Sequence, residues 1–399
     1  GPFLPDLIIS INSLYFIYLI VFKKIKINFK NIYVTLFFIW IIIILISSSA
    51  SQFIIHSYES SLFYIRFFLS SCMIALFINY KKTYIKYSFN ILLLIFSILI
   101  CDSIFQYFLK FNLFGMPSFD AKRMSSFFGE ELVLGSYLSR IFPYIIGVYI
   151  FLNIKEKIKP NIIIFIFILF TSITIFLAGE RAAILYLIIT ITGIFFIFDF
   201  KKIIIFLTIV FAILYYFISL VDSASFKRNF EYTFNQITIN DDRVTVFSTQ
   251  HETIFKSAIS MFKENPFFGV GAKNFRLLCS EDKYNFKSKH DLAFKGCQTH
   301  PHNFYLQFLS ETGFFSFLIL AFFFIVISIQ LIKLNINKYI KTISNSDYVL
   351  YFLYLTFFIN LFPFIPTGNF FNNWLASLMY LPLGLFIYIN LNKILTINE

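Results

Sequence analysis

Blocks of about 20 apolar residues recur along the whole chain and are separated by shorter polar segments. Each block is long enough to cross the hydrocarbon core of a bilayer as an α-helix. The apolar residues are continuous and do not alternate with polar ones, which excludes a barrel of membrane-spanning strands. The pattern predicts eleven membrane spans, at roughly residues 3–22, 31–49, 61–80, 87–109, 132–152, 160–178, 181–198, 202–221, 305–332, 347–365 and 373–392.

The polar segments between the predicted spans form two alternating sets. Short segments rich in lysine, which the positive-inside rule places in the cytoplasm, lie at 23–30, 81–86, 155–159, 201–202, 333–341 and 393. The segments predicted to face the periplasm lie at 47–60, 110–131, 179–180, 222–301 and 364–372. This topology places residue 1 outside and Glu399 inside.

The longest polar segment divides the chain into three parts. They are the first eight spans (1–221), a large periplasmic loop (222–301) and the C-terminal spans (302–399). Apolar residues in the loop recur at the spacing of an amphipathic helix that ends at Asn265-Pro266. These residues are Val246, Ile254, Phe255, Ala258, Ile259 and Phe262.

Composition agrees with a membrane protein. Hydrophobic residues make up 58% of the chain and charged residues 14%, which does not suit a soluble core with a polar surface. The predicted fold class is therefore an all-α polytopic membrane protein. The net charge of +12 is assigned to the lysine-rich loops, and no nucleic-acid partner is expected. The chain begins with Gly1-Pro2 and not with methionine, so a further helix before residue 1 is compatible with the pattern.

Two of the four cysteines, Cys279 and Cys297, fall in the predicted periplasmic loop. An oxidising compartment allows them to form a disulfide across a loop of moderate length. Cys72 and Cys101 lie within predicted spans, where we expect plain buried residues.

Charged residues inside a membrane are costly and usually functional. Those in or beside the predicted spans all lie toward the outer side, which predicts an anion-accepting cavity open to the outside. They are Arg66, Asp102, Arg140, Glu180 and Arg181. For Arg66 and Arg140 the alternative is a side chain that reaches the interface along its apolar stem. Arg181 begins a span, where a helix N-terminus and a fixed cation suit a phosphate, and pairing with Glu180 is the alternative.

The periplasmic loop adds Arg243 and the stretch KENPFFGVGAKNFR, which contains Lys273 and Arg276. Its Gly-Val-Gly piece lacks the flanking strand and helix of a dinucleotide site and predicts only a tight turn. The turn is expected to present Lys273 and Arg276 at a fixed place. The alternative for Arg243 and Arg276 is a solvated charged surface.

The loop ends in the stretch QTHPHNFYLQFLSETG, with His300 and His302 directly before a predicted span. Thr, Pro and Asn at this place also suit the start of a helix, and capping alone is one interpretation. No metal site is expected, because no Asp, Glu or Cys cluster lies nearby in the sequence. The favoured interpretation is a neutral histidine that takes a proton from a hydroxyl group while arginines bind a leaving diphosphate.

The pair His302-Asn303, followed by nine residues and Gly313, resembles the motif of the O-antigen polymerase and O-antigen ligase superfamily of bacterial membrane glycosyltransferases. The motif usually has a second Gly, Thr or Tyr three residues further on, and Ser316 departs from it. Arg181 resembles a conserved external arginine at a helix start in this family. The resemblance covers about residues 120–399.

Two further stretches carry the resemblance. Arg276 is similar to a conserved loop arginine after a Pro-Phe turn, and KRMSSFFGEELVLGSYLSR (122–140) is similar to an early periplasmic stretch of polymerase-like members. The resemblance implies a C-type glycosyltransferase fold with about 11–12 transmembrane helices, a periplasmic active site in the bacterial inner membrane, and neither metal nor cofactor. It assigns His302 as the base, and Arg181 and Arg276 as diphosphate ligands. The other residues expected to contact substrate are Arg243, His300, Asn303, Lys273, Arg140, Arg123 and Glu130.

Three functions remain open at this point. The favoured one is an inverting polymerase of undecaprenyl-diphosphate-linked repeat units, because of the 122–140 stretch, with membrane lipid and a chain-length regulator protein as further partners. The second is a ligase that transfers the glycan to lipid A-core or to a protein hydroxyl. The third is a transporter of lipid-linked sugars, for which the internal repeats and broken spans of transporters are not visible in the sequence.

Overall fold

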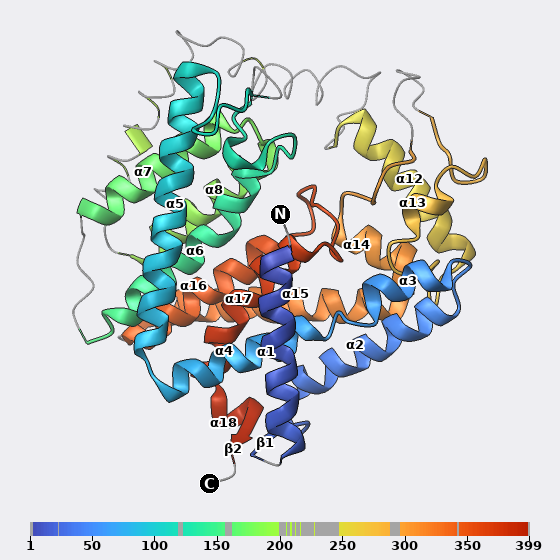
Figure 1. Ribbon diagram of the computed structural model, residues 1–399, viewed down its shortest axis with the longest axis horizontal. Helices are drawn as coiled ribbons and strands as arrows, with labels where there is room; N and C mark the ends of the chain where they lie inside the picture. Colours follow the sequence, from blue (N-terminus) through green and yellow to red (C-terminus); the bar gives the residue numbers. More distant parts are fainter. Residues whose placement is uncertain are drawn as a thin grey trace. The chain divides into compact units, whose positions relative to one another are not determined.

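The computed structural model of the chain describes residues 3–22, 24–118, 123–155, 162–198, 247–287, 296–340 and 343–397, with a few single residues between 205 and 227. The regular secondary structure in these ranges is almost entirely helical, as Figure 1 shows, which confirms the predicted all-α class. Two short strands, β1 (Ile25–Ile27) and β2 (Leu395–Ile397), pair antiparallel. The chain therefore joins a segment near its beginning to one near its end.

Six segments in the described part of the chain are helical, long and apolar enough to cross a membrane. They are Phe3–Val21, Ile32–Ser49, Ile54–Tyr80, Thr83–Leu109, Leu134–Leu152 and Phe304–Ile340. Shorter apolar helices lie at Ile166–Leu177, Arg181–Ile197 and Asn373–Ile389. A polytopic membrane protein is thus confirmed, while the predicted span 202–221 falls outside the described ranges except at single positions.

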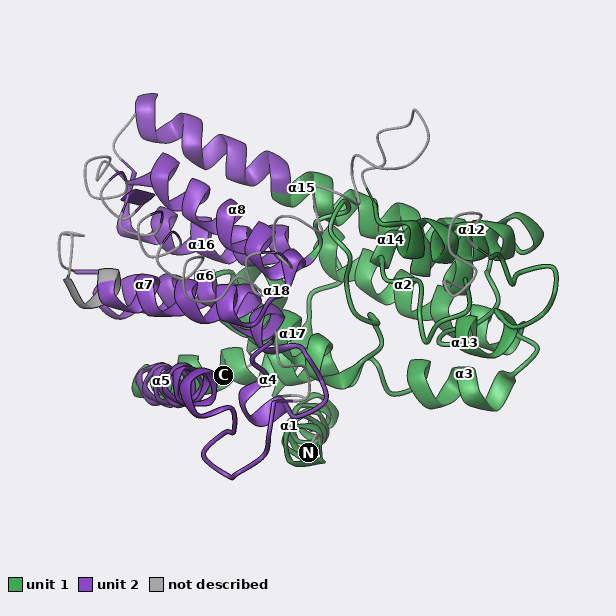
Figure 2. Ribbon diagram, turned by 90° about the horizontal axis from the view of Figure 1, so that it is seen from above, with its two compact units in different colours: residues 1–84, 246–327, 361–399 green, residues 85–245, 328–360 purple. Residues whose placement is uncertain are grey.

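The chain forms two compact units, coloured separately in Figure 2, and each is built from segments that are distant in sequence. Unit 1 contains residues 1–84, 246–327 and 361–399, and unit 2 contains residues 85–245 and 328–360. The long helix α15 (Gly313–Ile340) begins in unit 1 and ends in unit 2.

Unit 1 is organised around α4, which packs against α1 and α17. A Cβ atom at Gly384 of α17 would lie 2.6 Å from Cγ2 of Ile74, so a glycine is required for this close approach of α4 and α17. The helices of unit 1 besides α15 are α1 (Phe3–Val21), α2 (Ile32–Ser49), α3 (Ile54–Ser61), α4 (Arg66–Tyr80), α12 (Thr249–Glu264), α13 (Phe275–Leu278), α14 (Phe304–Gln307), the π-helical turn η3 (Phe308–Thr312), α17 (Asn373–Ile389) and α18 (Leu391–Ile394).

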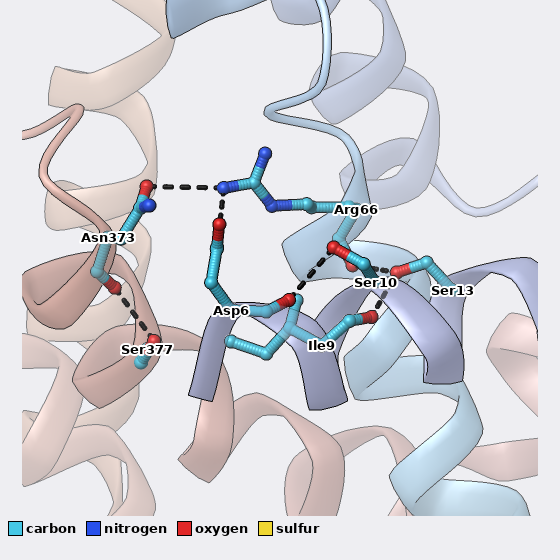
Figure 3. Close-up of polar contacts among 7 residues, drawn as sticks. All are labelled: Asp6, Ile9, Ser10, Ser13, Arg66, Asn373 and Ser377. Atoms are coloured by element: carbon cyan, nitrogen blue, oxygen red, sulfur yellow. Dashed lines mark hydrogen bonds and ion pairs between the residues drawn. The ribbon is translucent and has the colours of Figure 1, made fainter. Parts of the chain in front are cut away.

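Arg66, at the start of α4, has protein partners on two other helices (Figure 3). Its Nη2 donates to a carboxylate oxygen of Asp6 at 2.7 Å and to the amide oxygen of Asn373 at 3.2 Å. The Ser13 hydroxyl donates to the Arg66 carbonyl at 2.6 Å. The sequence left open whether Arg66 snorkels to the interface or has a functional role. In the structure, Arg66 joins α1, α4 and α17.

Unit 2 is organised around α6, which packs against α7, α8 and α16. The buried Asp102 carboxylate of α5 accepts hydrogen bonds from the Leu113 N–H at 2.7 Å and the Ser126 hydroxyl at 2.5 Å, and so fixes the loop that follows α5. The expectation that Cys101 is buried is wrong, because its place on α5 is exposed. The helices of unit 2 besides α15 are α5 (Thr83–Leu109, from its third residue), η1 (Ser126–Phe128), α6 (Leu134–Leu152), α7 (Ile162–Leu177), α8 (Arg181–Ile197) and α16 (Asn345–Asn360).

The predicted amphipathic helix corresponds to α12. Ile254 and Ala258 are buried as expected, but Ile259 is 40% exposed and Met261 completes the buried face. Successive residues of a helix are about 100° apart, so Ile259 lies next to the buried stripe and not within it. Val246 lies outside the described residues.

Candidate active site

His300 and His302 lie in the segment directly before α14, and the loop before α17 holds both of them. His302 has a φ of 55°, so the chain turns sharply before the helix begins. The His302 carbonyl accepts the N–H of Thr367 at 2.8 Å. Nε2 of His300 lies 3.3 Å from the Thr367 carbonyl, and Nδ1 lies 2.9 Å from the Thr299 hydroxyl. The ring centroids of the two histidines are 4.0 Å apart.

The bonds of His300 define its tautomer. A carbonyl oxygen only accepts hydrogen bonds, so Nε2 of His300 carries the hydrogen and Nδ1 accepts one from the Thr299 hydroxyl. Both ring nitrogens of His300 are thereby engaged by protein groups. Of the two histidines of the motif, His302 is the better placed to accept a proton from another molecule.

Asn303 provides the helix cap that the sequence suggested. Its side-chain oxygen accepts from the N–H groups of Tyr305 at 2.9 Å and Leu306 at 3.1 Å, and its amide nitrogen donates to the Pro363 carbonyl at 2.7 Å. The structure thus shows the cap at Asn303, whereas a base at His302 stays a prediction. Asn303 starts α14, and His302 stays outside the helix.

Burial favours the neutral form of both histidines. It lowers the pKa of His300 to about 3, and the nearby positive charges of His302, when protonated, and of Arg276 act in the same direction. Burial also lowers the pKa of the His302 imidazole below its ordinary value. A neutral imidazole is the form that can accept a proton.

The Gly-Val-Gly piece forms a tight turn that lies against η3. Gly269 and Gly271 have φ of 66° and 100°, and a Cβ atom at Gly269 would overlap the backbone of Glu311. The N–H of Val270 donates to the Ser310 carbonyl at 2.9 Å, and that of Gly271 donates to the Glu311 carbonyl at 2.8 Å. The turn is thus attached to the helix that begins at the histidine motif.

Glu311 anchors this turn from within the core of unit 1. Its fully buried carboxylate accepts the N–H of Phe275 at 3.3 Å and the Gln307 amide at 2.8 Å. The same Gln307 nitrogen donates to Asn369 at 2.9 Å, and the Gln307 oxygen accepts the N–H of Phe370. These bonds connect the turn, η3 and the loop that holds the histidines. Glu311 therefore stabilises the framework of the site.

The turn brings two cations close to the histidines. Lys273 has a φ of 58° and a half-buried side chain, and the exposed Arg276 lies on α13. Burial lowers the pKa of Lys273, and the neighbouring Arg276 charge lowers it further. Arg276 also acts on the pKa of His300. Lys273, Arg276 and His300 are therefore within electrostatic reach of one another.

A disulfide joins the Arg276 helix to the histidine segment. Cys279 and Cys297 are bonded, with their Cα atoms 4.7 Å apart. Arg276 lies three residues before Cys279, and His300 lies three residues after Cys297. The bond thus shortens the path between a candidate diphosphate ligand and the histidine pair.

A third histidine, which the sequence analysis did not single out, lies beside the pair. His251 is in the first turn of α12, and its ring centroid is 5.7 Å from that of His302. The two residues are about 50 positions apart, so no local spacing in the sequence could indicate the contact.

Four of the other expected site residues lie in unit 2. Arg140 is only 1% exposed, so a snorkelling role is excluded for it. It donates to the amide oxygen of Asn360 at 2.9 Å and to the Tyr186 hydroxyl at 2.8 Å, and its guanidinium lies over the Tyr186 ring. Arg123 donates to the carbonyls of Ala178 and Leu132, at 3.3 and 2.9 Å. Glu130 is exposed in a turn, and Arg181 is the first residue of α8.

The carboxylate of Glu180 caps the start of α6. It accepts the N–H groups of Gly135 at 2.6 Å and Ser136 at 3.0 Å, and the Ser136 hydroxyl at 2.6 Å. Burial raises the pKa of Glu180, while the Ser136 bonds and the Arg123 charge oppose that rise. Glu180 thus has a structural function at the start of α6.

Within the ranges that the structure describes, no three His, Cys, Asp or Glu residues are grouped as a metal site would need. Arg243 lies outside those ranges. The candidate site of unit 1 is thus composed of His300, His302, Lys273 and Arg276, with His251 beside them.

Comparison with known families adds to this geometry. A search of curated proteins finds no match to the chain. Residues 164–321 match a family described as O-antigen ligase. The matched segment contains Arg181, Arg276, His302 and Gly313, the positions that carried the resemblance in the sequence. This match supports the resemblance of the chain to the O-antigen polymerase and O-antigen ligase superfamily.

Proposed function

We propose that this protein transfers a glycan from an undecaprenyl-diphosphate carrier to an acceptor hydroxyl at the periplasmic face of the bacterial inner membrane. The observation that carries the proposal is the contact of the His302 ring with His300, whose two ring nitrogens are engaged by protein groups and whose pKa is lowered by the nearby Arg276. A base and an anion-binding cation are the two groups that such a transfer requires.

The proposed reaction is a direct displacement. Nε2 or Nδ1 of His302 takes the proton from the acceptor hydroxyl, and the oxygen attacks the anomeric carbon of the donor. The bond from that carbon to the diphosphate oxygen breaks, and the electron pair leaves with the diphosphate. Attack from the side opposite the leaving group inverts the anomeric carbon. Arg276 and Lys273 are assigned to the charge that develops on the diphosphate.

The favoured acceptor is the sugar of a second lipid-linked repeat unit, which makes the protein an O-antigen polymerase. The 122–140 stretch supports this choice, because it is similar to polymerase-like members. A ligase that transfers the glycan to lipid A-core is the second candidate, and it is supported by the family description that residues 164–321 match. Both reactions use the same donor and the same base.

The first experiment uses the full-length purified protein, lipid-linked repeat units from the source strain, and no other acceptor. We expect a ladder of products on a gel, lost in His302→Ala and kept in His56→Ala, since His56 lies on α3 beside Glu59. A single transfer that appears only when lipid A-core is added would make the protein a ligase. A ladder of unchanged strength from His302→Ala would contradict the assigned base.

A further inference from the structure

His251 has a fixed place at the start of α12. Ser248 is the N-cap of this helix and accepts the backbone N–H of His251. The Ser248 hydroxyl also lies 2.6 Å from Nδ1 of His251. One serine thus holds both the backbone and the imidazole of His251, so the ring is presented in a defined orientation.

The fixed ring is in contact with the proposed base. The centroids of His251 and His302 are 5.7 Å apart and their planes are 89° apart, so the rings meet edge to face. This is a favourable arrangement for aromatic rings. On its other side, the centroid of His251 lies 6.1 Å from that of Phe255, one turn further along α12.

The contact is supported by packing of the helix that carries it. Ile254, Ala258 and Met261 of α12 belong to a buried cluster with Val270 of the Gly-Val-Gly turn. The helix also packs against α14 and η3, the elements that directly follow His302. Packing of α12 therefore holds the backbone of His251 near His302, and the Ser248 hydroxyl orients its ring.

We propose that His251 is a positioning residue for His302, which holds the base in the orientation for proton transfer and competes with it for protons in acid. This inference rests on the proposed function. It goes further than that function because it assigns a role to a residue outside the histidine motif.

Protonation of His251 and protonation of His302 are expected to oppose each other. His302, Arg276 and His251 all lower the pKa of His300, whereas burial lowers the pKa of His302 and a hydrogen bond with the Thr367 backbone raises it. Lys273 lies beside Arg276, and His251 contacts the His302 ring. A protonated His251 at 5.7 Å opposes a second positive charge on His302. Coulomb's law with the dielectric constant of water gives an effect of about 0.5 pH unit at that distance, and burial increases it. Loss of His251 should therefore allow His302 to protonate at a higher pH.

The test compares His251→Phe and His251→Ala with the wild-type protein and with His56→Phe, the same change at a histidine of α3. The probe is diethyl pyrocarbonate, which reacts with neutral imidazole, and mass spectrometry follows modification of His302 against pH. We expect the midpoint for His302 to move up by about 0.5 pH unit or more in both His251 variants. The His56→Phe variant should keep the wild-type midpoint.

Transfer rates provide the second readout. At the pH of maximal activity, His251→Phe should retain most of the wild-type rate, since it keeps a ring against His302. His251→Ala should lose roughly tenfold, because small displacements of a reacting group are costly. An unchanged midpoint in both variants, together with a wild-type rate in His251→Ala, would overturn the inference.

The design separates this inference from the proposed function. Transfer that persists in His302→Gln would refute the base assignment, whereas the chemical modification of His302 would still report on the contact with His251. If His251→Ala does not fold, Ser248→Ala is the second variant, because it releases the ring and leaves the histidine in place. The pH midpoint of His302 modification should rise in Ser248→Ala, and it should have the wild-type value in Ser248→Thr. Wild-type behaviour of Ser248→Ala would count against the positioning role.

Discussion

At the scale of single residues, His302 and its neighbour Asn303 have different contacts. Asn303 caps α14, and the carbonyl of His302 is held by the Thr367 N–H. The sequence favoured a base at this position, with helix capping alone as the alternative, and the base stays a prediction. The place of His302 depends on its φ and on a loop about 65 residues further along, neither of which local spacing reveals.

Arg276 permits a direct test of diphosphate binding. An arginine fork can donate two parallel hydrogen bonds to a phosphate, whereas lysine presents a point charge. We expect Arg276→Lys to lower the transfer rate roughly tenfold to a hundredfold, which corresponds to the loss of one charged hydrogen bond. The resemblance assigns the same role to Arg181, so Arg181→Lys should be impaired as well. Initial rates with the lipid-linked repeat unit measure both variants.

The control for this exchange is Lys283→Arg in the same part of the chain. Lys283 is half exposed and lies 2.9 Å from the Glu264 carboxylate, so it has a structural partner of its own. Its variant should transfer glycan at the wild-type rate. Full activity of both Arg276→Lys and Arg181→Lys would argue against bidentate binding of the diphosphate.

At the scale of elements, the sequence predicted the apolar helices well because their signal is continuous. The spacing of apolar residues predicted α12, but it placed Ile259 on the buried face of that helix, where Ile259 is in fact exposed. The sequence did not show the break between α3 and α4: α3 (Ile54–Ser61) lies almost entirely in the predicted loop 47–60, and the predicted span 61–80 begins before α4 (Arg66–Tyr80). The reason is that the break between them, at Leu62–Ile65, is itself apolar.

The attachment of the Gly-Val-Gly turn to η3 depends on Gly313. This residue has φ 81° and ψ −178°, and a Cβ atom there would overlap the Phe267 carbonyl. We expect Gly313→Ala to destabilise the protein by about 2 to 5 kcal/mol, from backbone strain and from the overlap together. Glycan transfer should fall with it, because the turn carries Lys273 and Arg276. Thermal unfolding in detergent measures the loss of stability.

Gly129 provides the matched control. It has φ 60° and ψ −122°, which is also unfavourable for other residues, but an added Cβ atom meets nothing within 4 Å. Gly129→Ala should therefore cost only the strain, about 1 to 3 kcal/mol. Equal losses in the two variants would show that the turn does not depend on its close approach to η3.

At the scale of the whole molecule, the order of segments in the fold differs from their order in the sequence. The family match at 164–321 draws residues from both compact units, so neither unit alone contains the matched segment. His251 and Glu311 lie in one continuous segment of unit 1, residues 246–327, in which α12 packs against α14 and η3. Sequence patterns indicate helices and short motifs. They do not indicate which residues far apart in the sequence, such as His251 and His302, come into contact.

The charge pattern predicts how the molecule is oriented, and α5 allows a test within unit 2. Lys86 is exposed in the second turn of α5, and the 75% exposed Phe114 follows the end of that helix. The helix between Lys86 and Leu109 is about 35 Å long, enough to cross the hydrocarbon core. The positive-inside rule then places Lys86 in the cytoplasm and Phe114 outside.

Single cysteines at these two positions, in a Cys101→Ala background, measure the orientation with a membrane-impermeant maleimide on whole cells. We expect Phe114→Cys to be labelled once the outer membrane is permeabilised, and Lys86→Cys to be labelled only after the inner membrane is opened. The reverse pattern would place the loop after α5 in the cytoplasm. A periplasmic site for the 222–301 loop would then be untenable, since the same alternation of lysine-rich segments assigns both loops to one side.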